Sequence, residues 1–249
     1  MDDRELQLQR MKELATRARY RHVPSFTRFL EAPMEIPART CANAADVRIR
    51  FFGGYEDAER RMAGFTTDEE DPLYFPISTV AIRWNPKYAS PGHRDILGAL
   101  MNLGIERDVL GDIAFSKEDG TAYLFVCEDM ESYICASLES VGHTRVKAER
   151  YDGGILIREP EGVNLRTTVA QSRMDAILAS ACKLSRSEAQ RLIETGLVRR
   201  NHIPELRSDI RLEANDLLSV RGYGRMRVLS IDDTPTRKGR IVVHIFRYT

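Results

Sequence analysis

The sequence lacks long apolar runs and net charge. No apolar run among its 249 residues approaches the length of a membrane-spanning helix, which excludes a helical membrane protein. The start, MDDRELQLQR, is acidic and polar, whereas a secretory signal has a basic start and an apolar segment. Hydrophobic residues make up 43% of the chain and charged residues 30%, which argues against a disordered class. We therefore expect a cytoplasmic protein of one large domain or two to three small ones, with no membrane partner.

Patterns for metal binding are also scarce. The four cysteines, at positions 41, 127, 135 and 182, form no CxxC pair and have no histidine at metal-ligand spacing. Buried thiols in a reducing compartment therefore fit better than the alternative, a zinc site. We predict no bound metal and no cofactor.

The zero net charge conceals a division along the chain. Residues 1–78 have a net charge of −2 and residues 79–164 of −5, whereas residues 165–249 have +7, from 16 Lys+Arg against 9 Asp+Glu. Nearly all of this basic charge is arginine, which binds phosphate with two hydrogen bonds and stacks on bases. The C-terminal charge indicates nucleic acid, although a merely solvated basic surface fits it equally well.

The N-terminal third has the pattern of a mostly helical region. Apolar residues fall on one face of a helix over residues 4–20, and prolines at positions 24, 33 and 37 then break the chain. Gly53-Gly54 predicts a turn before a second helix; a phosphate-binding loop is less favoured, because the lysine and spacing of a P-loop are missing. The basic residues Arg17, Arg19 and Arg21 are a candidate secondary RNA contact or a solvated helix face.

The middle third predicts a βαββαβ order, as in ferredoxin-like and RNA-recognition-motif domains. The expected strands are 78–84, 112–116, 121–127 and 144–149, and the expected helices are 93–103 and 128–142, the latter ended by Gly142. RNA-recognition domains stack bases on exposed strand aromatics, and Phe115, Tyr123 and Phe125 are available here. We favour core positions for Tyr123 and Phe125, because the surrounding run is apolar and the acidic charge repels RNA.

His93-Arg94-Asp95 matches the tripeptide of the protein-kinase catalytic loop. A kinase needs asparagine five residues after the aspartate, where this chain has Leu100, and no glycine-rich loop, VAIK lysine or DFG is present. A kinase is therefore excluded. Asp95 is expected in the first turn of a helix, where a carboxylate complements the helix dipole. We favour a solvated helix entry for His93 and Arg94 over an RNA contact.

The C-terminal region predicts two helices followed by strands. Apolar residues recur at helical spacing from Met174 to Ala181, and Ser185 with Glu188 fits a capping box that opens a second helix ended by Gly196. The strands are expected in LLSVRG, GRMRVLSI and RIVVHIF. Polar residues around the second helix predict an RNA-binding face; with their neighbours downstream they are Arg173, Ser185, Arg186, Arg191, Arg199, Arg200, Asn201, His202, Arg221 and Arg225. The alternative for Arg173 and Arg186 is a surface salt bridge with Asp175 or Glu188.

Three segments of this region resemble the S-four domain, the RNA-binding fold of small-subunit ribosomal protein four. They are RMDAIL (173–178), LSRSEAQRLIETGLVRRN (184–201) and NDLLSVRG (215–222). Asn215 stands where a glycine is usual, which costs little because asparagine tolerates a left-handed turn. His202-Ile203-Pro204 replaces the glycine and lysine that often follow Asn201, which weakens the match to that part of the RNA contact.

The whole chain resembles the YlmH family, also called RqcP. The resemblance is carried by FTRFLEAP, FFGGYEDAERR and HRDILGALMNLGIERDVLGDI, followed by an S-four domain that ends in VRGYGR. It implies a non-enzymatic RNA-binding protein of ribosome-associated quality control. Such a protein binds large-subunit rRNA and peptidyl-tRNA on the large ribosomal subunit and supports a nascent-chain-tailing factor that adds C-terminal alanines. The sequence patterns and the resemblance together predict an α+β fold class, with a mostly helical domain (1–76), an RRM-like domain (77–162) and an S-four-type domain (163–249).

Two other functions stay open on the residues alone. An RNA-modifying enzyme would need convergent acids, bases or nucleophiles, and the five histidines are isolated from one another in the sequence. A protein-binding scaffold with accessory RNA binding is favoured by the −5 charge of the middle third. We predict no catalytic residue and no small-molecule substrate.

Overall fold

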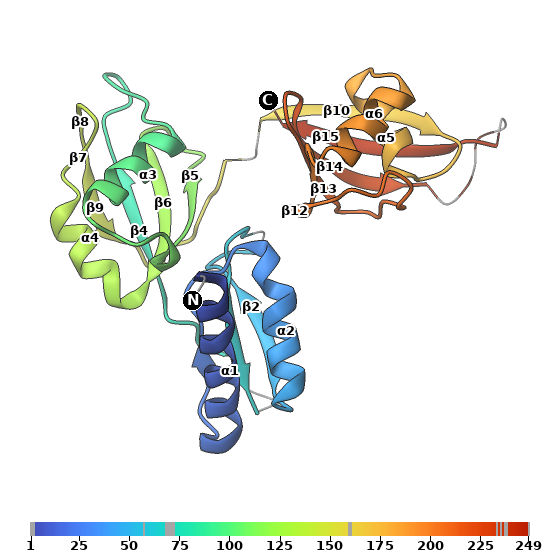
Figure 1. The fold of residues 1–249 in the computed structure, drawn as a ribbon. Coiled ribbons are helices and arrows are strands. Elements are labelled where there is room, and N and C mark those ends of the chain that lie inside the picture. Colours follow the sequence, from blue (N-terminus) through green and yellow to red (C-terminus); the bar gives the residue numbers. More distant parts are fainter. Residues whose placement is uncertain are drawn as a thin grey trace. The chain divides into compact units, whose positions relative to one another are not determined.

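The computed structural model describes residues 3–56, 58–67, 73–158, 161–232, 234, 236 and 239–248. The chain forms two compact units, Met1–Glu159 and Pro160–Thr249, each with helices packed on antiparallel sheet (Figure 1). The α+β class predicted from the sequence is confirmed. The boundary expected at residues 76 and 77 lies inside the first unit, and the three-domain division stays a prediction.

The N-terminal part of the first unit packs two helices on a small sheet. Helices α1 (Asp3–Arg21) and α2 (Glu35–Ala44) cover the three-stranded sheet β1-β3-β2, formed by Ser25–Phe26, Met62–Thr66 and Arg48–Phe52. The helix predicted over 4–20 is confirmed. Ala15 and Ala18 on α1 are fully buried, so small side chains let α1 approach its neighbours closely.

Two sequence predictions in this part are wrong. No helix follows Gly53-Gly54: the described residues there form a loop, and strand β3 begins at Met62. The apolar and charged residues of this stretch mimic a helical pattern, but its backbone N–H groups are bonded to a distant carboxylate described below. Pro37 does not break the chain, because it lies in the first turn of α2, where its missing N–H has no intrahelical partner.

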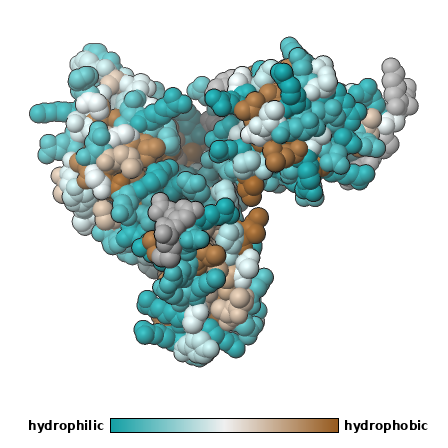
Figure 2. Space-filling view, viewed as in Figure 1, coloured by the Kyte–Doolittle hydropathy of each residue, from teal (hydrophilic) through white to brown (hydrophobic). Residues whose placement is uncertain are grey.

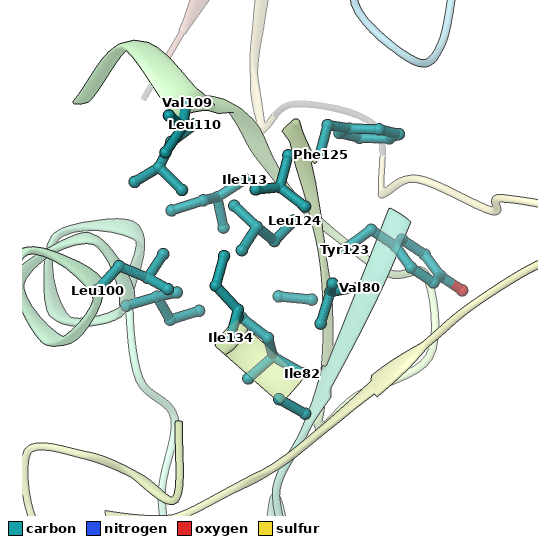
Figure 3. Packing of buried hydrophobic residues seen from close by; sticks show 14 of the residues in the cluster. Val80, Ile82, Leu100, Val109, Leu110, Ile113, Tyr123, Leu124, Phe125 and Ile134 are labelled. Carbon is teal, nitrogen blue, oxygen red and sulfur yellow. The ribbon is translucent and has the colours of Figure 1, made fainter. Parts of the chain in front are cut away.

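The rest of the first unit has the predicted βαββαβ order. The elements are β4 (Ile77–Arg83), α3 (His93–Asn102), β5 (Leu110–Phe115), β6 (Thr121–Cys127), α4 (Glu131–Ser137) and β9 (Lys147–Arg150). Their strands form one antiparallel sheet in the order β5-β6-β4-β9, the arrangement of a split βαβ fold. Leu100 of α3 and Ile134 of α4 meet Leu124 on the same side of the sheet (Figure 3).

The second helix of this fold is shorter than predicted. After a 3-10 turn (Glu128–Met130), α4 ends at Ser137, and β7 (Ser140–Val141) pairs with β8 (Thr144–Arg145). Gly142 has φ +58° in the tight turn of this hairpin. The glycine was therefore correctly identified as a turn residue, but it closes a hairpin and not the helix.

The strand aromatics of the middle fold belong to the core, as predicted. Tyr123 and Phe125 are buried and project from β6 away from the side occupied by Leu100 and Ile134 (Figure 3). Phe125 stacks on Tyr55 with ring centroids 4.9 Å apart, and Tyr123 packs on Tyr151 at 5.0 Å. The rings are thus covered by protein and do not form an open base-stacking platform.

The second unit packs two helices on a six-stranded sheet. Its elements are β10 (Gly162–Val169), α5 (Met174–Cys182), α6 (Arg186–Glu194), β11 (Val198–Arg200), β12 (Ile203–Pro204), β13 (Leu217–Val220), β14 (Gly224–Ile231) and β15 (Ile241–Tyr248). The sheet order is β10-β15-β14-β13-β11-β12. The predicted capping box is confirmed, since Ser185 accepts from the Glu188 N–H and Glu188 accepts from the Ser185 N–H. Gly196 has φ +73° and follows Thr195, the residue that caps the end of α6, as expected.

Candidate nucleic-acid interface

A fully buried carboxylate organises the start of both helices in the second unit. Asp175, in the first turn of α5, accepts from the Nε and Nη2 of Arg173 at 3.1 and 3.0 Å. It also accepts from Arg186 Nε at 3.0 Å and from Gln190 Nε2 at 2.9 Å. Burial alone would raise the pKa of Asp175, but these hydrogen bonds outweigh it and lower the pKa to about 2. The carboxylate is therefore ionised at neutral pH and ties α5 to α6.

The two arginines held by Asp175 differ in exposure. The Arg173 side chain is 27% exposed and donates to the carboxylate through both Nε and Nη2. The Arg186 side chain is 58% exposed and donates to it through Nε. The ion pair considered for both residues is present with Asp175, while Glu188 caps the helix instead. Because Arg186 is fixed in place and still faces solvent, its remaining N–H groups are presented to an anion with little loss of side-chain entropy.

A second buried carboxylate organises the hairpin after α6. Asp216 forms an ion pair with Arg200 at 2.8 Å and accepts from Asn201 Nδ2 at 2.8 Å and from the Glu213 N–H at 2.8 Å. Asn201 and His202 have φ of +48° and +70°, so they form the two-residue turn between β11 and β12. The Asn201 amide is therefore engaged within the protein, where it fixes the hairpin beside Arg200.

The predicted RNA-binding residues lie on two sides of the C-terminal sheet. Arg199 pairs in register with Ser219, which pairs with Arg225, whereas the neighbouring Val198 and Met226 point into the core below the helices. Arg199 and Arg225 therefore lie on the face turned away from α5 and α6. The ten residues predicted to form one face are therefore divided between two faces, because successive residues of a strand point to opposite sides of the sheet.

The remaining members of the predicted set are placed as follows. Arg191 and Arg221 are exposed, His202 is half-buried in the hairpin turn, and the Ser185 hydroxyl serves the helix cap. None of these contacts tests RNA binding, and the set stays a prediction as a whole. Sequence reasoning weighed Asp175 only as a surface partner and missed Asp216, although both occur in arginine-rich surroundings that signal a paired carboxylate.

The secondary candidates lie on α1. Arg17, Arg19 and Arg21 are exposed, and Arg19 forms a 3.2 Å ion pair with Asp46. A shallow hollow of about 570 Å³ on this helix is lined in part by Lys12, Arg17 and Arg21. The helix face is thus basic and accessible, and its RNA contact stays a prediction.

The kinase-like tripeptide has the structural role expected for it. Asp95 accepts from the Gly92 N–H at 2.8 Å at the start of α3, and Ile96 and Leu100 of this helix are fully buried. His93 and Arg94 lie in the first turn of α3, and both are exposed. The segment begins a helix whose apolar face packs on the sheet.

Comparison with known proteins gives the family. A family model described as "Putative RNA-binding domain in YlmH" matches residues 69–153. The "Ribosome-associated protein quality control protein P2" of Bacillus subtilis (strain 168) is 35% identical over 212 residues, which cover 83% of this chain and 80% of that protein. The chain belongs to the YlmH family. The solved structure of the cell division protein ylmH from Streptococcus pneumoniae is 22% identical, with a TM-score of 0.49, over 61% of this chain and 93% of that one.

Two sequence strings that carried the YlmH resemblance contact each other. Asp112, at the end of HRDILGALMNLGIERDVLGDI, accepts from Tyr55 Oη at 3.0 Å and from the N–H groups of Glu59 and Arg60 at 2.7 and 3.2 Å. Arg60 donates through Nε to the Leu110 carbonyl at 2.8 Å, and burial lowers the pKa of Arg60. This Asp112 junction joins the loop after β2 to strand β5.

The described residues of this YlmH-family chain were also compared with the requirements of metal binding, thiol chemistry and membrane insertion. Within it, no group of three or more His, Cys, Asp or Glu side chains is placed to hold a metal ion. All four cysteines are free, and burial raises the pKa of Cys127 to about 12. No described helix is both long and apolar enough to cross a bilayer, and Figure 2 shows a largely hydrophilic surface in this view.

Proposed function

We propose that this chain is a non-enzymatic RNA-binding factor of ribosome-associated quality control in the cytoplasm. The proposal is supported by membership of the YlmH family and by the name of the Bacillus subtilis relative. It includes binding of the large ribosomal subunit through large-subunit rRNA and peptidyl-tRNA. It also includes support of a nascent-chain-tailing factor that adds C-terminal alanines.

The observation that carries the proposal is the Asp175 cluster. A buried carboxylate positions Arg186 at the first residue of α6, beside backbone N–H groups that have no intrahelical partner. A guanidinium and a helix N-terminus both favour a phosphate group. Arg173 lies beside it, and Arg200 is fixed on the hairpin by Asp216. The ion pairs within the protein thus preorganise these arginines as a phosphate-binding surface.

Sedimentation and crosslinking test the proposal. Tagged protein from cells with stalled ribosomes is expected in the large-subunit fractions of a sucrose gradient, with crosslinks to rRNA and tRNA. Deletion of the gene is expected to shorten or remove alanine tails on stalled chains. Protein that stays at the top of the gradient under these conditions would exclude the ribosomal role.

One observation favours a second function for the middle segment. Residues 79–164 have a net charge of −5, and the rings of Tyr123 and Phe125 are covered. The family model that matches this segment is described as an RNA-binding domain, and the acidic charge adds a basic protein partner as a second candidate. Capture of a protein by this chain after ribonuclease treatment, and its loss when surface acids are neutralised, would support a scaffold role. Retention of ribosome binding by the same variants would separate that role from RNA binding.

A further inference from the structure

The face of the C-terminal sheet that is turned away from α5 and α6, called the open face below, combines arginines with aromatic rings. Alternate residues of β10, β14 and β15 point into the core, among them Leu165, Val228 and Ile245. Their neighbours point away from α5 and α6 and pair across the sheet. The pairs are Arg166 with His244, Asn164 with Phe246, and Arg227 with Phe246.

An aromatic and arginine cluster occupies the β14–β15 side of this face. The rings of Phe246 and Tyr248 meet edge to face, with centroids 5.0 Å apart. Arg227 Nε donates to Tyr248 Oη at 3.1 Å, and the Arg225 guanidinium carbon lies 5.3 Å from the Tyr248 ring centroid. Gly162 leaves room for Phe246, because a Cβ at this position would come within 2.5 Å of the ring. The two rings are thus held in place by neighbours on the same face.

A hollow lies beside this cluster. It has a volume of about 420 Å³, and its lining includes Asn164, Arg166, Ser230 and His244. It lies next to the irregularity in β14 between Val228 and Ser230, where the pairing with β15 shifts. Polar groups and a guanidinium therefore surround this hollow.

Charge favours an anion on this face. The six described strands of the sheet contain six arginines and no aspartate or glutamate. Four of these arginines lie on the open face, at positions 166, 199, 225 and 227. Asp232, which follows β14, lies 3.7 Å from His244. Arginines interleaved with aromatic rings are the combination that binds unpaired nucleotides.

We propose that this face, formed by β10, β14 and β15, binds a short stretch of single-stranded RNA. Bases stack on Phe246 and Tyr248, while Arg166 and Arg227 pair with phosphates. The face lies outside residues 173–222, which carry the S-four resemblance, and on the opposite side of the sheet from Arg186. The inference extends the RNA-binding function by a second surface, and different variants test the two surfaces.

The experiment uses the full chain and an unpaired 12-nucleotide RNA with a central 2-aminopurine. Phe246→Leu keeps an apolar side chain but removes the ring, so the affinity is expected to fall about tenfold and the quenching of 2-aminopurine to disappear. Phe246→Tyr keeps the ring and is expected to bind like the wild type. The pair Arg166→Ala and Arg227→Ala is expected to reduce the salt dependence of binding by about one to two phosphate contacts. Arg186→Ala is expected to leave this affinity within about twofold while weakening binding to large subunits.

Three results would overturn the inference. The first is wild-type binding of the oligonucleotide by both Phe246→Leu and the double arginine variant. The second is loss of binding through Arg186→Ala alone. The third is a complex in which 2-aminopurine is not quenched and from which poly-glutamate displaces the RNA. This result would identify a surface for acidic peptides. If Phe246→Leu lowers the melting temperature strongly, the double arginine variant and Phe246→Tyr decide the question.

Discussion

At the scale of single residues, two aspartates organise the arginines of the second unit. Asp175 is fully buried and Asp216 is 5% exposed, and each pairs with an arginine that reaches the surface. Their role in the proposed interface is to position cations, since a buried carboxylate cannot itself meet an RNA phosphate. The arginines keep donors for a ligand because each guanidinium has five N–H groups.

The pKa of Asp175 gives a prediction for stability against pH. Because the folded pKa, about 2, lies below that of an unfolded aspartate, the carboxylate stabilises the fold above about pH 4. This stabilisation is lost as the pH falls toward 2. Asp175→Asn is expected to lower the free energy of unfolding of the second unit by about 1–3 kcal/mol at pH 7. The difference in melting temperature from the wild type should shrink between pH 4 and pH 2, and a constant difference would contradict the assignment.

The arginines of this candidate site can be recognised in the sequence, whereas their arrangement cannot. Arg186 was identified from a capping box and a basic pattern, both local features. The burial of Asp175 depends on the packing of α5 on α6, and the link from Asn201 to Asp216 joins residues fifteen apart. Neither interaction follows from residue type or short-range spacing. The separation of Arg199 and Arg225 from the helices required the strand register.

At the scale of elements, the Asp112 junction holds the loop after β2 on strand β5. Asp112→Ala removes the acceptor for three donors, two of them backbone N–H groups. We expect the free energy of unfolding to fall by about 2–4 kcal/mol, measured by urea denaturation. Tyr55→Phe is the matched control, because it keeps the ring stack on Phe125 and removes one hydrogen bond, at a cost of about 1 kcal/mol. Equal stability of Asp112→Ala and the wild type would show that the junction is dispensable.

The start of α3 gives a milder prediction. Asp95→Asn weakens one cap hydrogen bond and the favourable interaction with the helix dipole, at an expected cost of about 0.5–1 kcal/mol. Binding to large subunits should not change. Weaker binding at an unchanged melting temperature would show instead that the His93–Asp95 turn contacts RNA or a partner.

The elements that the sequence predicted well have strong local signals. Strands β4 and β6 are apolar runs bounded by turn residues, and α6 has a cap at each end. The failures lie where a tertiary interaction overrides the local pattern. The loop after Gly54 is held by Asp112, and the chain after Ser137 turns into a hairpin. Strand β10 is not predicted by the sequence, because its residues are mostly polar and exposed and it forms by pairing with β15.

At the scale of the whole molecule, charge is divided between the two units. Residues 165–249 have a net charge of +7, which balances the negative charge of the preceding residues. An acidic first unit weakens general attraction to RNA, so the proposed RNA contacts of the full chain require cations at specific positions, among them Arg186 and Arg200 of the second unit. This division explains how a chain of zero net charge can act as an RNA-binding protein.

The most direct measurement of RNA binding by the second unit is the affinity of the full chain for purified large ribosomal subunits across a series of KCl concentrations. The test variant carries Arg186→Ala and Arg200→Ala. The control variant carries Arg207→Ala, which removes an exposed arginine whose Nε lies 3.4 Å from Glu205. We expect weaker binding by the test variant and a flatter dependence of log K on log[KCl], by roughly one unit for each phosphate group that the variant no longer binds. The control variant is expected to match the wild type. Wild-type affinity and salt dependence in the test variant would contradict the central claim that these arginines bind ribosomal RNA.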